Sequence, residues 1–502
     1  MDLMQTHVSE TIFFVDCESG LGLQAQLRET IVSAVLAGRI QPGSQLPSTR
    51  RLAVYLNISR ITVTVAYQEL VSQGYMEAVD RSSYRIARNP PGRSLVADQS
   101  PSQASEVDWS SKVALDFSVV RQVEKPLDWR RYPYPFLYGQ MDPTLFDLNA
   151  WRDCNRRALA REDFISMASD FAAADDVQLV NYICSRTLPR RGIHAHPDEI
   201  LVTVGAQNAL WIVTRLILGN GTTAVCENPC HPDISASLLL SGGNVTTINV
   251  DAEGLPPDNL PPGTDAVFVT PSHHSPTGAT MPIDRRMKLL QAATEKDFVI
   301  VEDDYEFEIS FLAPPSPALK SFDTAGRVLY IGSFSKSLFP GLRLGYLVAP
   351  APFIRQARAL RSLMLRHPPG HLQRTAAYFL ALGHYDAVLH RMRTEYHKRH
   401  VLMAENLKKQ DLVVAGSSSF GGTSFWMEGP KGLDADRLVR ELRQEGVLIE
   451  SGSPFFPRNE APCRFFRMGY SSIPSSNISV GVARVKAAID GHFRSNPSKG
   501  RA

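Results

Sequence analysis

Short amphipathic helices are predicted in the first ninety residues. Apolar side chains recur every three or four positions along residues 24–37 and 49–56, and again after Ser59. Ser48 and Ser59 each precede such a segment, at the position where a hydroxyl caps the first backbone N–H groups of a helix. Gly74 follows the last segment and is a natural helix stop. Two short capped helices joined by a tight turn are typical of a helix-turn-helix.

The helix that begins after Ser59 is the one expected to enter a major groove, because such helices present their first turn to base edges and phosphates. Strands predicted at 75–79 and 83–87 would form a wing beside it. Arginine suits bidentate contact to guanine or to a phosphate, and hydroxyl side chains reach phosphates. The side chains predicted to contact operator double-stranded DNA are Ser48, Arg50, Ser59, Arg60, Thr62, Thr64 and Arg81.

A different pattern runs through the long remainder of the chain. Apolar runs rich in β-branched side chains alternate with helical segments, which predicts a mostly parallel sheet covered on both faces. The predicted fold is therefore an α+β winged helix-turn-helix N-terminal domain followed by a large α/β domain. The strands of the large domain are predicted at 200–204, 223–226, 245–249, 266–270, 298–302, 328–332 and 344–348.

Length and charge agree with this division. The chain has 502 residues and a net charge of only +2, but residues 21–90 carry eight arginines, no lysine and four acidic residues. A local basic segment is the electrostatic footprint of a nucleic-acid-binding module. Residues 88–112 are rich in Pro, Ser and Gln and lack any period, as expected of a linker. We predict a DNA-binding domain at 20–88, a linker at 89–130 and an effector domain at 131–495.

The sequence disfavours a membrane-spanning protein, a secreted protein and a zinc-binding protein. The sequence has no run of about 18 apolar residues, and its N-terminus lacks the basic and apolar regions of a secretory signal. Six scattered cysteines fit reduced thiols, so we predict a cytoplasmic protein that does not contact a membrane. The segment 226–231 holds two cysteines and a histidine. No second ligand pair at zinc spacing follows it, so we predict a turn and no metal site.

Polar side chains follow five of the predicted strands, and ligands of such sheets bind at strand carboxyl ends. Lys336 follows one strand, and Asp303 and Tyr305 follow another. A lysine there can form a Schiff base with pyridoxal 5'-phosphate, and a neighbouring carboxylate can keep the pyridine nitrogen protonated. The phosphate needs hydroxyls, an arginine and helix N-terminal amides. The residues predicted to supply these groups are Ser333, Ser335, Arg343, Ala206 and Gln207.

The N-terminal motifs resemble the GntR family of winged-helix repressors. The resemblance rests on Leu46-Pro47-Ser48-Thr49-Arg50, then on Ser59-Arg60-Ile61-Thr62-Val63, and then on Leu70 followed by Gly74-Tyr75. It implies that Arg50, Arg60 and the residues around Thr62 and Thr64 lie at the family's DNA-contacting positions. The wing departs from the family's Gly-x-Gly, because Asp80-Arg81-Ser82-Ser83 stands there.

The large domain resembles fold-type I aminotransferases. The resemblance rests on Asp-x-Tyr, then Ser-x-Ser-Lys, then an arginine seven residues after the lysine. It implies that Lys336 is the lysine that forms the aldimine and that Asp303 contacts the pyridine nitrogen. It also implies that Tyr305 contacts the ring hydroxyl and Arg343 the phosphate. It also implies that Arg467 receives a substrate carboxylate. In two departures, Ser275 stands at the family's usual asparagine and His231 at its ring-stacking aromatic position.

The two domains together resemble the MocR or GabR-like regulators over about residues 20–490. The resemblance implies a transcription factor that binds pyridoxal phosphate, senses a small amino compound and forms a head-to-tail homodimer. The segments 131–140 and Asp142–Trp151 resemble regulators of ectoine or taurine utilisation. Asp233 would face the effector and favours a diamino acid from ectoine breakdown over taurine. The alternative is an active aminotransferase with an appended DNA-binding domain, because both classes use the same cofactor residues.

Overall fold

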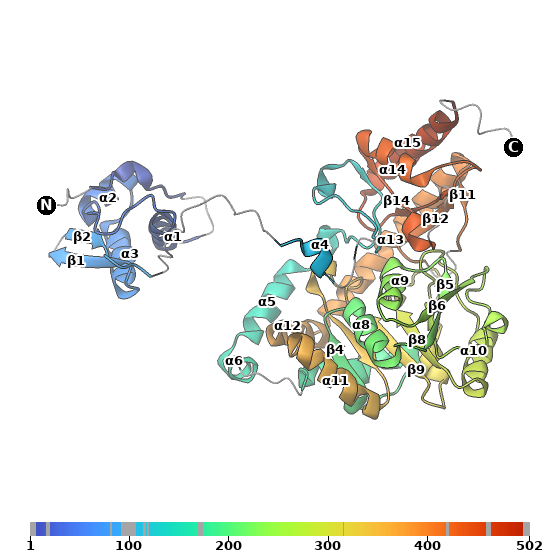
Figure 1. The fold of residues 1–502 in the computed structure, drawn as a ribbon. Helices are drawn as coiled ribbons and strands as arrows, with labels where there is room; N and C mark the ends of the chain where they lie inside the picture. Colours follow the sequence, from blue (N-terminus) through green and yellow to red (C-terminus); the bar gives the residue numbers. More distant parts are fainter. Residues whose placement is uncertain are drawn as a thin grey trace. The chain divides into compact units, whose positions relative to one another are not determined.

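The chain divides into two compact units, Met1–Leu115 and Asp116–Ala502 (Figure 1). The structure is a computed structural model. It describes residues 7–16, 21–80, 83–91, 107–113, 117, 120–168, 174–314, 316–417, 421–457 and 463–494. Arg81 and much of the predicted linker lie outside these residues, so the linker bounds stay a prediction. No helix in the described ranges is long and apolar enough to cross a membrane.

The first unit is the winged helix-turn-helix that the sequence predicts. Its elements are η1 (Glu10–Ile12), α1 (Leu23–Leu36), α2 (Thr49–Leu56), α3 (Arg60–Ser72), β1 (Met76–Asp80) and β2 (Ser83–Ile86). The two strands pair antiparallel. The apolar faces read from the sequence form its core, in which Leu27, Ile31, Leu52, Val63 and Leu70 are fully buried. A short α4 (Trp109–Lys112) follows within the predicted linker.

The second unit is built on a seven-stranded sheet with the order β4-β10-β9-β8-β7-β5-β6. The strands are β4 (Ile200–Thr203), β5 (Thr223–Asn228), β6 (Asn244–Asn249), β7 (Ala266–Val269), β8 (Val299–Asp304), β9 (Val328–Ser333) and β10 (Gly345–Val348). All seven predicted strands are therefore present. β10 runs antiparallel to both of its neighbours, so the sheet is mixed.

Helices cover both faces of this sheet (Figure 1). Alternate side chains of each strand point to opposite faces. On one face a single apolar cluster packs under α8 (Ala206–Ile217), α9 (Pro232–Leu239) and α11 (Ala351–Leu365). On the other face one cluster packs under α10 (Ile283–Glu295), and a larger one continues into the C-terminal part of the chain. The remaining helices before the C-terminal part are α5 (Leu148–Ala158), α6 (Arg161–Met167), α7 (Val177–Tyr182) and α12 (Gly370–Ala381).

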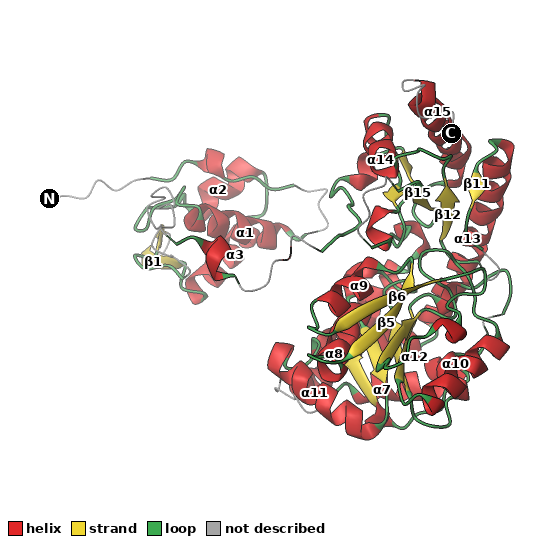
Figure 2. Cartoon of the chain, turned by 45° about the vertical axis from the view of Figure 1, so that its right-hand side comes forward, coloured by secondary structure: helices red, strands yellow, loops and turns green. Residues whose placement is uncertain are grey.

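The C-terminal part packs at one end of the large sheet (Figure 2). Its four-stranded sheet has the order β11-β12-β15-β14, formed by Val413–Val414, Ser424–Glu428, Phe465–Gly469 and Glu450–Ser451. A two-stranded pair joins β3 (Tyr134–Pro135) to β13 (Val447–Leu448). The helices here are α13 (His384–Lys409), α14 (Ala435–Gln444) and α15 (Ser475–Arg494). The β3–β13 pair brings residues just after position 135 beside the C-terminal part of the chain.

Candidate functional site

Lys336 lies just beyond the end of β9, in contact with Tyr138. Its Nζ lies 4.0 Å from the centroid of the Tyr138 ring, at cation–π distance. Burial and repulsion from Lys125 and Arg467 lower the pKa of Lys336 to about 7, although Glu306 opposes the shift. A large fraction of Lys336 is therefore the neutral amine near pH 7, which is the nucleophilic form.

Asp303 occupies the end of β8, next to β9 in the sheet. Its side chain is buried, and its Oδ1 has no hydrogen-bond partner in the described part of the chain. Burial and repulsion from Asp304 raise its pKa to about 7. A protonated pyridine nitrogen would supply the missing partner and hold this carboxylate ionised.

Two residues further on, the Tyr305 hydroxyl donates to the backbone carbonyl of His273 over 3.0 Å. Ser275, which stands at the family's usual asparagine, is buried, and its Oγ has no hydrogen-bond partner among the described residues. Burial raises the pKa of Tyr305 well above its ordinary value, so it is a neutral donor.

A cradle for a phosphate lies at the N-terminus of α8. Gly205 caps this helix with φ of 79°, and a Cβ there would lie 3.2 Å from Nη2 of Arg343. The close approach of Arg343 to the backbone thus requires a glycine. Ser335 donates its N–H to the Ser333 hydroxyl over 3.2 Å, while its own buried Oγ has no partner among the described residues. Helix amides, hydroxyls and a guanidinium together suit a phosphate.

The antiparallel direction of β10 explains how Arg343 reaches this cradle. A strand parallel to the others would begin at the opposite edge of the sheet. Because β10 pairs antiparallel to β9, its first residue, Gly345, lies opposite Ser333 at the end of β9. Arg343, two residues earlier, therefore stands at the same edge of the sheet as Ser333, another of the residues predicted to bind the cofactor.

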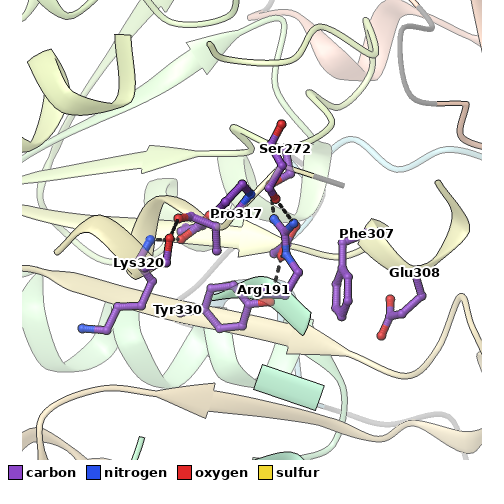
Figure 3. A network of polar contacts seen from close by, with 12 residues as sticks. Arg191, Ser272, Phe307, Glu308, Pro317, Lys320 and Tyr330 are labelled. Carbon is purple, nitrogen blue, oxygen red and sulfur yellow. Dashed lines mark hydrogen bonds and ion pairs between the residues drawn. The ribbon is translucent and has the colours of Figure 1, made fainter. Parts of the chain in front are cut away.

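A buried polar network around Arg191 holds Asp304, the residue that follows Asp303 (Figure 3). Arg191 donates from Nε to Oδ2 of Asp304 over 2.7 Å and from Nη2 to the Ser272 hydroxyl over 2.6 Å. The Tyr330 hydroxyl donates to the same Asp304 oxygen over 2.7 Å. Burial lowers the pKa of Arg191, but Asp304 more than offsets this effect and raises it overall. The two adjacent aspartates thus differ, since Asp304 pairs with Arg191 and the described part of the chain shows no ion pair to Asp303.

The predicted stacking residue His231 caps α9. Its Nδ1 accepts a hydrogen bond from the N–H of Asp233 over 3.3 Å. Burial and repulsion from Arg467 and Lys336 lower the pKa of His231 to about 3, so the ring is neutral. Burial raises the pKa of Asp233, although Arg343 and Lys336 oppose the shift. Both side chains therefore lie in the electrostatic field of the predicted cofactor residues.

Arg467 is already paired with a carboxylate. Its Nε and Nη2 both lie 2.7 Å from Oε2 of Glu450. Its guanidinium lies 4.0 Å from the Tyr138 ring centroid and 4.7 Å from that of Phe455. Burial raises the pKa of Glu450, but Arg467 and Lys125 outweigh this and hold it below its ordinary value. The sequence predicted a ligand carboxylate as the partner of Arg467 and gave no indication of this internal one.

Several residues of the site were missed by sequence reasoning. Tyr138 lies in the segment 131–140, which carried only a family resemblance. Glu450 closely follows the buried pair Val447–Leu448. A charged residue directly after an apolar run is a signal that could have identified it. Lys125 gave no signal, because it falls in the stretch predicted to be a linker.

The first unit presents the predicted DNA-contacting residues at the start of α3. Ser48 and Ser59 act as N-caps and accept hydrogen bonds from the N–H groups of Arg51 and Ile61. Arg60 is exposed and donates from Nε to the Thr49 hydroxyl over 3.4 Å. Ile61 is 73% exposed, which is unusual for an isoleucine and which the sequence pattern did not indicate. An apolar group here can contact a thymine methyl.

The other side chains predicted to contact DNA differ in their exposure to solvent. Arg50 is exposed, and Thr62 and Thr64 are partly exposed. The Thr64 hydroxyl donates to the carbonyl of Arg60 over 2.8 Å, so it is partly engaged within the helix. Arg81 lies outside the described residues.

The fold and the sites define a class of protein in which a winged helix-turn-helix is joined to an aminotransferase-like domain. Residues 23–86 match the family of bacterial regulatory proteins of the gntR type, and residues 153–485 match aminotransferase class I and II. The solved structure of LysN, an alpha-aminoadipate aminotransferase from Thermus thermophilus complexed with N-(5'-phosphopyridoxyl)-L-leucine, is 26% identical. It covers 77% of this chain and 100% of its own, with a TM-score of 0.69.

Two regulators are similar over nearly the whole length. The HTH-type transcriptional regulator TauR of Rhodobacter capsulatus is 48% identical over 93% of this chain and 96% of its own. The probable rhizopine catabolism regulatory protein MocR of Rhizobium meliloti is 28% identical over 95% of each chain. The chain belongs to this MocR-type family of transcriptional regulators, which join a GntR domain to an aminotransferase class I and II domain. Aminotransferases of this fold family depend on pyridoxal phosphate.

Proposed function

We propose that this regulator binds pyridoxal 5'-phosphate and, through it, senses a short amino acid whose best candidate is taurine. The observation that carries the proposal is the unpartnered Oδ1 of the buried Asp303, beside Lys336 and the Arg343 cradle. Lys336 would attach the cofactor covalently. The Ser333 and Ser335 hydroxyls, Arg343 and the Ala206 and Gln207 amides would hold its phosphate. When bound, the cofactor supplies an electrophilic carbon with which a primary amine can react.

The spacing of the charged groups supports a short effector that carries both an amine and an acid group. Lys336 Nζ and the Arg467 guanidinium carbon each lie 4.0 Å from the centroid of the same Tyr138 ring. The two atoms are therefore no more than 8.0 Å apart. A molecule whose amine reaches the position of Lys336 can therefore place its acid group beside Arg467 even when only a few bonds separate the two groups.

Taurine is favoured over a diamino acid by the 48% identical relative, which is named a TauR regulator. Asp233 is the residue from which the sequence predicted an effector with a second amine. Its Oδ2 lies 3.9 Å from Nδ1 of His231. Taurine, the alternative effector that the sequence left open, is therefore the one that we adopt.

The test is a titration of the cofactor-loaded protein with taurine, diaminobutyrate, its acetylated form and γ-aminobutyrate. Visible absorbance and affinity for operator DNA are followed in the same samples. We expect taurine to change both. Borohydride reduction followed by peptide mapping should place the cofactor on Lys336. A label on another lysine, or DNA affinity that no compound alters, contradicts the proposal.

A second candidate function is transamination, because the lowered pKa of Lys336, about 7, also suits a lysine that accepts and returns a proton. Sustained consumption of taurine that depends on a keto acid, without a change in DNA binding, would favour this enzyme. We propose the sensor because the family joins the domain to a DNA-binding unit. The head-to-tail homodimer, the cytoplasmic location and the DNA contacts of Arg50, Arg60, Thr62 and Thr64 belong to the same proposal. Sedimentation of the loaded protein tests the homodimer.

A further inference from the structure

Lys125 forms a charged triad with Glu450 and Arg467 at the edge of the candidate site. Lys125 Nζ lies 3.3 Å from Oε1 of Glu450, whose other oxygen binds Arg467. Lys125 also donates to the backbone carbonyl of Tyr138 over 2.7 Å, and the Tyr138 N–H donates to Glu450 over 3.3 Å. Lys125 therefore has a defined position, although it stands near the beginning of the second unit, which starts at Asp116.

The triad holds two cations and one carboxylate, so it retains one unit of positive charge. Glu450 is 1% exposed and Arg467 is 2% exposed. The charge that the buried Glu450–Arg467 pair leaves unbalanced is that of Lys125, whose side chain is 29% exposed, so one additional anionic group can pair with it from the solvent side. A ligand with a single acid group would supply it.

Of the two cations, Lys125 is the more accessible. Its side chain is 29% exposed, against 3% for Arg467. The Arg467 guanidinium carbon lies 4.0 Å and 4.7 Å from the centroids of the Tyr138 and Phe455 rings, and its Nε and Nη2 both contact Glu450. An incoming acid group can consequently pair most readily with Lys125, from the solvent side.

We propose that Lys125 is a recognition residue for the acid group of the effector, with Glu450 as the internal counter-charge that positions Lys125 and Arg467 before the effector binds. This inference rests on the proposed function for the identity of the effector. The positive charge of Lys125 also reaches the rest of the site, since it contributes to lowering the pKa values of Lys336 and His231. Lys125 therefore links the acid subsite to the chain segment that leads from the DNA-binding unit.

The first experiment compares the wild type with Lys125→Ala in the cofactor-loaded form, titrated with taurine and with ethanolamine, which has an amine and no acid group. Loss of a charge-assisted hydrogen bond should weaken taurine binding by about tenfold or more. Ethanolamine should bind equally well or better. Lys125→Arg should restore most of the taurine affinity, because it keeps the positive charge at this position.

The control variant is Lys296→Ala, since Lys296 also donates to a backbone carbonyl, that of Leu260, over 3.5 Å but lies outside the site. It should leave both affinities unchanged. If Lys125→Ala binds taurine as the wild type does, the inference is wrong while the proposed function stands.

The second experiment distinguishes a failure of the Lys125 inference from a failure of the taurine proposal. Ethanesulfonate, which has the acid group of taurine and no amine, should raise the melting temperature of the wild type and of Lys296→Ala, and not that of Lys125→Ala. This outcome supports the acid subsite even if taurine leaves absorbance and DNA binding unchanged, in which case only the taurine proposal fails. Equal stabilisation of all three proteins, or of none, overturns the role of Lys125.

Discussion

Gly139 and Lys336 approach so closely that position 139 has no room for a side chain. A Cβ built on Gly139 would overlap Nζ of Lys336, and Gly139 itself has φ of 71°. The overlapping atom is the end of a flexible side chain, which can move aside without unfolding the protein. The glycine therefore matters for where the amine of Lys336 points more than for the fold.

We expect Gly139→Ala to fold but to bind the cofactor covalently less well, because the methyl group displaces Nζ. Gly263→Ala is a matched control, since Gly263 has φ of 73° and no atom within 4 Å of the position that its methyl group would take. Both variants should lose about 1 kcal/mol or somewhat more of unfolding free energy through backbone strain. Only Gly139→Ala should show a weaker visible absorbance band after incubation with pyridoxal phosphate. Equal absorbance in the two variants would contradict this role of Gly139.

The covalent attachment of the cofactor should depend on pH around neutrality. Burial, Lys125 and Arg467 lower the pKa of Lys336 to about 7. Since the neutral amine attacks the aldehyde, the attachment rate of the cofactor-free protein should rise as the pH increases through about 7 and then level off. Stopped-flow absorbance between pH 5.5 and 9 measures this midpoint. A midpoint near that of an ordinary lysine, above about 10, would show that the site does not lower the pKa.

Removing the two adjacent aspartates should have opposite consequences. Asp304→Ala leaves the buried cation Arg191 without its carboxylate, so we expect a loss of about 3–5 kcal/mol of unfolding free energy. Asp303→Asn should cost little stability, because Oδ1 of Asp303 has no hydrogen-bond partner among the described residues. It should nevertheless weaken cofactor binding. Urea denaturation and cofactor titration distinguish the two, and a severe loss of stability in Asp303→Asn would be inconsistent with its assignment.

The stability of Asp303→Asn should also vary with pH relative to the wild type. In the folded cofactor-free protein the pKa of Asp303 is raised to about 7. Its protonated form therefore favours folding, and this contribution is lost as the pH rises from the unfolded pKa of about 4 through 7. The variant should gain stability relative to the wild type over that interval. A pH-independent difference in urea midpoints would argue against the raised pKa.

Arg60 and Arg51 should contribute differently to DNA binding. Arg60 stands at the first position of α3. Arg51 lies on α2, and its Nε is 2.5 Å from Oε1 of Glu10. Arg60→Ala should cost about 1–3 kcal/mol of operator binding if it contacts a base edge, and Arg51→Ala less. A gel-shift titration at fixed salt compares them. Unchanged operator affinity in Arg60→Ala would exclude this placement of the helix in the groove.

Local patterns were sufficient to predict the helices of the first unit and the strands of the large sheet, but not the small C-terminal sheet. The predicted helix 49–56 coincides with α2, and the strand 328–332 differs from β9 by one residue. Caps such as Ser48 and Ser59 act on the next turn of the same helix, so the sequence alone carries the information. The motif around Lys336 was likewise readable, because its members follow one another on a single strand–loop–strand segment.

The sequence by itself determined the division into a winged helix and an aminotransferase-like domain, because periodicity and motif spacing are local properties. Only the tertiary structure decided that β10 runs antiparallel, since strand direction depends on pairing with distant residues. The same holds for the contact between Arg467 and Glu450 and for that between Glu450 and Lys125. These charges meet because β14 pairs with β15 and the segment before Tyr138 packs against them, and no local pattern encodes either contact.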